Sequence, residues 1–202
     1  MASPLIRGAH AIVILGLVAG CGSAPAPSVE PTIPERPALP DGWHEVTSDA
    51  GDVRLALPAD LDVIFTGSGV MAQRAVPDEE ARLEVIAVGP ADVFPQPRTG
   101  EQVRTWLADH LWVPIAGEGG VVQLADASER EVVLPAGRAL EVATTAVSGS
   151  PDDGRVMVYA IATEGGLAIL RFVGRPGTIN AREDELRLIA LLAQFGDIAD
   201  AS

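Results

Sequence analysis

The chain has 202 residues, enough for one domain with appendages but short for two full domains. Apolar residues make up 48% of it, so a single buried core can form. The formal net charge of −14 disfavours binding to nucleic acid or to an anionic lipid surface. Such a charge is typical of exported domains, which it keeps soluble.

Residues 1–20 have the features of a bacterial export signal. Arg7 supplies a positive charge ahead of an apolar run from Ala11 to Gly20. A helix of that length spans about 15 Å, roughly half of a bilayer's hydrocarbon core, so the run is too short to cross a membrane comfortably. The run ends in Val18-Ala19-Gly20-Cys21, which resembles the bacterial lipobox, whose cysteine receives diacylglycerol.

Cys21 is the only cysteine in the chain, so neither an intrachain disulfide nor a cysteine metal site can form. We predict that Cys21 is lipidated and that the mature protein is anchored on the extracytoplasmic face of the cell membrane. A single acyl chain binds a membrane only marginally, so the two chains of a diacylglycerol would give a stable anchor. The alternative is an ordinary signal peptide, or an uncleaved anchor, in which Cys21 stays unmodified.

Residues 21–41 form the predicted tether, with prolines at positions 25, 27, 31, 34, 37 and 40. This spacing excludes helices and sheet ladders and favours polyproline II. At about 3.1 Å per residue the tether could hold the domain up to roughly 60 Å from the bilayer. A ligand for an SH3-type domain is the alternative, but such partners are rare outside the membrane.

The predicted domain spans residues 42–202 and begins with strands. Turn residues at 48–51 and 67–69 predict hairpins that join 43–48 to 52–57 and 62–66 to 70–76. Residues 83–88 alternate like a half-buried strand.

A helix is predicted after Thr99, which forms a capping box with Gln102, and it ends before Pro114. Its apolar stripe consists of Val103, Trp106, Leu107, His110 and Leu111.

Short turns connect the elements that follow. Strand-like runs cover 121–125 and 129–134, and Pro135-Ala136-Gly137 then leads into strands at 138–147, 155–163 and 167–173. Connections this short require antiparallel neighbours. A last helix is predicted from the N-cap Asn180 to about Phe195, with Glu183 at its third position. The fold class is therefore α+β, an antiparallel sheet flanked by two main helices.

The order of these elements resembles the PsbP-like fold, a family that includes bacterial lipoproteins similar to DcrB. The resemblance covers roughly residues 43–195 and rests on the Trp43 hairpin, the helix near Thr99, the turn from Leu134 to Ala139 into Leu140-Glu141-Val142, and the terminal helix. It implies an accessory or docking module rather than an enzyme, and it assigns no functional residue.

Candidate catalytic residues are few. His44 and His110 are the only histidines after the signal, and His110 falls on an apolar stripe, where a buried histidine is commoner than a base or ligand. Ser68 does not fit the G-x-S-x-G nucleophile elbow, because the residue two positions before it is Thr66 and not glycine. The acidic runs 78–80, 152–153 and 183–185 lack the spacing of calcium loops. We therefore predict no catalytic residue, no metal site and no cofactor.

Three functions remain open at this stage. A non-enzymatic accessory or docking module of the cell envelope, bound to an envelope protein, is favoured. A carrier of a lipophilic small molecule would need a cavity behind Trp106 and Phe195. An envelope hydrolase would need His44 or His110 beside a serine and an acid.

Overall fold

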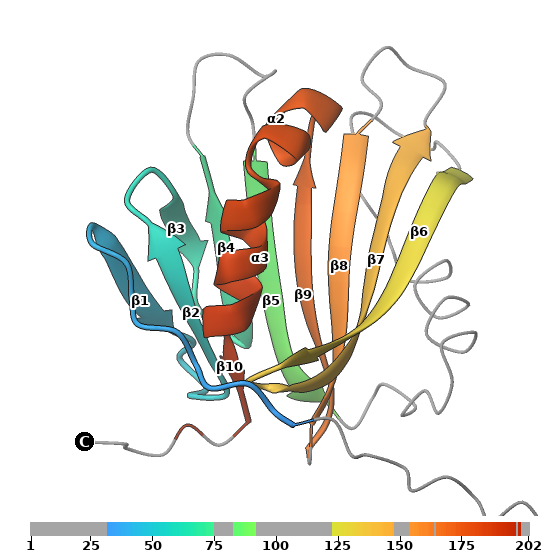
Figure 1. Cartoon of the computed structure of the whole chain (residues 1–202). Helices are drawn as coiled ribbons and strands as arrows, with labels where there is room; N and C mark the ends of the chain where they lie inside the picture. The colour runs from blue at the N-terminus through green and yellow to red at the C-terminus, as the bar shows by residue number, and fades with distance from the viewer. Residues whose placement is uncertain are drawn as a thin grey trace, which may run out of the picture. The chain divides into compact units, whose positions relative to one another are not determined.

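A computed structural model describes residues 32–74, 83–91, 123–147, 154–163, 165–196 and 198 (Figure 1). The helix predicted for residues 99–113 lies outside these residues, as does the export signal. Within them the chain forms two antiparallel sheets and two helices. No helix of this described part is long and apolar enough to cross a membrane.

The smaller sheet has three strands in the order β1-β2-β10. They are β1 (Trp43–Thr47), β2 (Val53–Pro58) and β10 (Gln194–Phe195). The hairpin of β1 and β2 confirms the first predicted hairpin, because the turn residues at 48–51 are local signals that need no distant partner. The third strand comes from the other end of the chain and pairs Phe195 with Val53.

The larger sheet has seven antiparallel strands in the order β3-β4-β5-β9-β8-β7-β6. They are β3 (Asp62–Phe65), β4 (Gly69–Gln73), β5 (Leu83–Ala91), β6 (Gln123–Leu134), β7 (Gly137–Val147), β8 (Gly154–Thr163) and β9 (Gly166–Gly174). The predicted antiparallel meander is confirmed. Where two runs were predicted at 121–125 and 129–134 there is one strand, because a register shift between Ala125 and Ser128 lets β6 continue.

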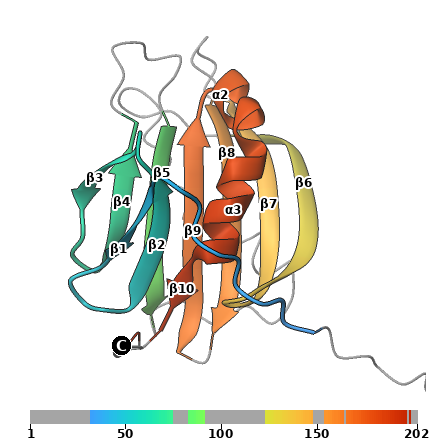
Figure 2. The ribbon, with the colours of Figure 1, turned by 60° about the vertical axis from the view of Figure 1, so that its left-hand side comes forward.

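The core lies between this sheet and the layer formed by the helices and the small sheet (Figure 2). Alternate residues of the strands point into it, as the period of two requires. Leu55, Val85 and Leu170 are fully buried there, and α3 (Glu183–Leu192) adds Leu186, Ile189 and Ala190.

The C-terminal helix differs from the prediction. The structure has α2 (Pro176–Ala181) and α3 separated at Arg182, so Asn180 lies inside α2 and caps nothing. Pro176 starts α2 early, because proline is favoured in a first helical turn. At the other end Ala193 is extended and Phe195 lies in β10, not in the helix.

The opposite, outer face of the large sheet is apolar as well. Its buried residues are Leu140, Val142, Val156, Val158, Ala160, Leu167, Ile169 and Val173. The described helices and the small sheet all lie on the other face (Figure 1). Both faces of the large sheet therefore carry buried apolar side chains that are shielded from water.

Candidate functional site

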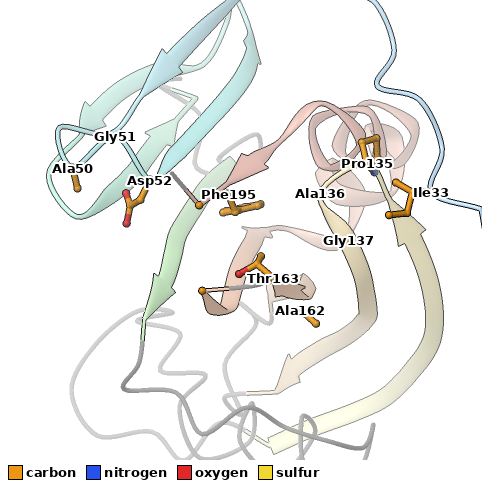
Figure 3. A pocket seen from close by; sticks show the side chains of 12 residues that line it. Ile33, Ala50, Gly51, Asp52, Pro135, Ala136, Gly137, Ala162, Thr163 and Phe195 are labelled. Carbon is orange, nitrogen blue, oxygen red and sulfur yellow. The ribbon is translucent and has the colours of Figure 1, made fainter. Parts of the chain in front are cut away.

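A pocket of about 970 Å³ opens at the end of the large sheet where the β6–β7 and β8–β9 turns lie (Figure 3). Turns, and the termini of strands, form most of its wall. The lining residues are Ile33, Ala50, Gly51, Asp52, Pro135, Ala136, Gly137, Ala162, Thr163, Gly165, Phe195 and Gly196. Most of these residues are small, and Asp52 is the only charged one among the described residues that line the pocket.

The position of Asp52 is set by Ser48, which is 4% exposed. The Ser48 hydroxyl donates a hydrogen bond to the Asp52 carboxylate at 2.7 Å and accepts hydrogen bonds from the backbone N–H groups of Asp52 and Val53 at 3.2 and 3.1 Å. A Cβ at Gly89 would overlap the Asp52 carboxylate in its present position, so a larger residue there would require Asp52 to move. The Asp52 carboxylate is therefore a hydrogen-bond acceptor that Ser48 holds in a defined position.

The turn that carries Asp52 is held against the β3–β4 turn. The backbone N–H of Asp49 donates to the Thr66 carbonyl at 2.5 Å, and the Thr66 hydroxyl donates to the Asp49 carboxylate at 2.9 Å. The Ala50 N–H donates to the Gly67 carbonyl at 3.3 Å. These bonds join the small sheet to the large one and make this pocket wall rigid.

The opposite wall is the turn from Pro135 into β7. Gly137 has a φ of 138°, and a Cβ there would lie 2.5 Å from the Ala162 carbonyl oxygen. Only glycine tolerates both conditions. Glycine is therefore needed at position 137 of the predicted Leu134–Ala139 turn for two reasons: the backbone conformation of the turn and the close contact with β8.

The end of the predicted tether forms part of the site. Arg36 donates a hydrogen bond from Nε to the Leu192 carbonyl at the end of α3 (3.0 Å) and from Nη2 to the Glu45 carboxylate of β1 (2.5 Å). Ile33 lies on the pocket wall beside Pro135 (Figure 3). Residues 32–40 were expected to be a free spacer, but in the structure they contact the domain.

A second polar cluster lies between α3 and the strands β6 and β7. Glu141 is 7% exposed, and its carboxylate accepts hydrogen bonds from Arg130 of β6 at 2.8 Å and from Arg187 of α3 at 3.5 Å. Arg187 also pairs with Glu183 at 2.5 Å. A buried carboxylate needs such partners, so we interpret this cluster as a structural link between helix and sheet.

Tyr159 of β8 faces Glu141 across the strand pair and is 1% exposed. Its ring packs edge-on against Phe172, with the ring centroids 6.2 Å apart. Burial raises the pKa of Tyr159 above its ordinary value of 10.0, and the negative charge of Glu141 raises it further. The native state therefore keeps this phenol protonated at a pH where the unfolded chain loses the proton.

This raised pKa predicts alkaline destabilisation. The stabilising contribution is fully present below pH 10 and is lost as the pH rises from 10 towards the native pKa, by about 1.4 kcal/mol per pH unit. The chain has one tyrosine and no lysine, so tyrosinate absorbance reports Tyr159 alone. Urea unfolding of the parent and of Tyr159→Phe between pH 9 and about 12 measures the effect. An equal loss of stability in the variant would contradict the assignment.

The predicted candidate residues lie apart from one another. His44 is exposed in β1, and Ser68 is exposed in the β3–β4 turn. Of the acidic run 183–185, Glu183 pairs with Arg187 and Glu185 with Arg182. Cys21, His110, Trp106 and the acidic runs 78–80 and 152–153 lie outside the described residues. Among the described residues no three His, Cys, Asp or Glu side chains converge as a metal site would need.

Three residues of the site were missed from sequence. Asp52 looked like an ordinary turn residue, and its serine four residues earlier was the available signal. Glu141 interrupts an apolar strand, which could have marked it as a buried, paired carboxylate. Arg36 had no signal, because both of its partners are distant or on another element.

An antiparallel sheet covered on one face by a C-terminal helix and a small N-terminal hairpin sheet defines the PsbP-like class of α+β folds, which confirms the predicted resemblance. The described structure is similar to the solution structure of cyanobacterial PsbP (CyanoP) from Synechocystis sp. PCC 6803, with a TM-score of 0.54 and 10% identity over 76% of this chain and 92% of that chain. At this identity the likeness establishes the fold alone.

A second similar structure is that of LpqN, a protein involved in cell envelope biogenesis of Mycobacterium tuberculosis. It has a TM-score of 0.45 and 12% identity over 76% of this chain and 90% of that chain. No family model and no curated protein matches the sequence.

Proposed function

We propose that this chain is a lipid-anchored extracytoplasmic protein whose domain is a non-enzymatic docking module of the cell envelope. The lipobox-like Val18–Cys21 after a short apolar run supports the anchor. The PsbP-like fold supports an accessory role. The observation that supports the docking role best is the pocket at the sheet end, where hydrogen bonds hold the turn that carries Asp52 against the β3–β4 turn.

The chemistry of the pocket defines the partner. Asp52 offers a positioned carboxylate, and Phe195 offers a half-buried aromatic ring in the same wall. A carboxylate accepts hydrogen bonds and favours a cation, while an aromatic ring stacks on an apolar or cationic group. The partner that fits is a protein segment with a basic or amide side chain beside an apolar one. The negative charge of the chain would favour such a segment at longer range.

Site-specific photo-crosslinking in cells tests this role. A photoreactive amino acid at Ala50, an exposed residue of the pocket rim, should trap one discrete envelope protein. The same group at Asn180, exposed on α2, should not trap it. Asp52→Asn should reduce the trapped product, since it removes the charge while keeping the shape of the side chain. Equal trapping from both positions, or none from Ala50, would contradict docking at the pocket.

A carrier of a lipophilic small molecule remains a second candidate, favoured by the pocket volume. About 970 Å³ falls within the range of small-molecule sites, and Ile33, Pro135 and Phe195 supply apolar wall. Crosslinks from Ala50 to lipid alone, with no protein adduct, would favour the carrier over the docking module.

A further inference from the structure

The last part of the tether is attached to the domain rather than free. Arg36 is half-buried and connects residues 32–40 to two elements, the C-terminal end of α3 and strand β1. The prolines at positions 34, 37 and 40 keep the intervening backbone extended and reduce its freedom before docking. The backbone N–H of Trp43 then donates to the Pro40 carbonyl at 3.2 Å, so the segment enters β1 through a defined turn.

The docked segment meets the domain at one particular end. Ile33 lies at the pocket wall beside the β6–β7 turn (Figure 3), and the segment runs from there past the lower end of α3 (Figure 1). Helix α2 lies at the opposite end of β9 (Figure 2). Strand β9 has nine residues, so these two ends are separated by about 30 Å.

We infer that the Arg36 contact is an orienting clamp, which shortens the tether and holds the pocket end of the domain towards the membrane. This inference rests on the proposed lipid anchor at Cys21. With residues 32–40 docked, ten residues separate Cys21 from the docked segment, and a polyproline II stretch of that length spans about 31 Å instead of the roughly 60 Å expected for the whole tether. The pocket then faces the bilayer surface, and its partner is a protein segment that emerges from the membrane nearby rather than a distant envelope protein.

Energy transfer on vesicles tests the orientation. In the mature protein Cys21 would carry lipid, so a cysteine placed at Ala50 or at Asn180 is the only free thiol for a donor dye. With acceptor-labelled lipid in zwitterionic vesicles, we expect stronger transfer from position 50 than from position 180. Arg36→Ala should reduce transfer from position 50 and shrink the difference, whereas Arg54→Ala, an arginine that contacts Thr47 and Gln194, should change neither.

A second measurement tests the clamp without a lipid. In the Cys21→Ala protein, a spin label at Glu35, which is exposed, should give the spectrum of an immobilised side chain, and Arg36→Ala should sharpen it. A sharp spectrum before the substitution, or equal energy transfer from both positions, would overturn the clamp. An immobilised label in the Cys21→Ala protein, together with a mature Cys21 protein that fails to bind vesicles, would instead overturn the proposed anchor and the orientation, while the docked segment would stand.

Discussion

Replacing Cys21 by alanine is expected to move the protein out of the detergent phase and to leave an unprocessed precursor. Under the proposed function the diacylglycerol on Cys21 attaches the mature protein to the membrane, and the substitution removes the thiol that carries it. A diacylglycerol group buries two acyl chains, each CH₂ contributing about 0.8 kcal/mol, and without it the acidic chain has no attraction to an anionic surface. Detergent-phase partitioning should show the parent in the detergent phase and the variant, as an unprocessed precursor, outside it.

Ser23→Ala provides the matched control, because it changes a small side chain next to the same cleavage site and leaves the thiol in place. It should partition like the parent. Mass spectrometry of the mature parent should show the lipid on Cys21. An unmodified thiol at that residue would refute the anchor, and with it the membrane-facing orientation of the pocket.

Replacing Val156 by aspartate is expected to lower the free energy of unfolding of the domain strongly. Val156 is fully buried on the outer face of β8, and its neighbours across the strands are Val173 and Thr144. Neither neighbour offers a positive charge, and the arginine two residues before Val173 on β9, Arg171, already interacts with Glu84. An uncompensated buried charge costs about 3–5 kcal/mol, a large share of a typical stability of about 5–15 kcal/mol. Urea unfolding followed by circular dichroism measures the loss.

Ile64→Asp is the matched control, because it introduces the same side chain on β3 at a position that is 50% exposed. It should cost about 1 kcal/mol or less. A Val156→Asp protein that is as stable as this control would show that the outer face is open to water.

The strands and turns could be predicted because their signals are local. Turn residues at 48–51 and 135–137 and strict alternation at 83–88 depend on the chain's own geometry, and the structure places hairpins and strands there. The division of the last helix could not be predicted in this way. Asn180 and Glu183 read as one N-terminus, but the helix breaks at Arg182, whose side chain pairs with Asp60 and Glu185.

The sequence by itself therefore determined the antiparallel α+β class of the domain, whereas the export signal with its lipobox-like cysteine remains a prediction. The tertiary structure alone decided that Phe195 pairs with Val53 in a second sheet, that Asp52 and Pro135 share a pocket, and that Arg36 docks at the end of α3. The physical reason is that each of these contacts joins residues from separate elements, most of them far apart in the chain. Such contacts leave no periodic or capping pattern in the sequence. The strand edge, carboxylate or carbonyl that each residue contacts comes close to it only when the chain folds.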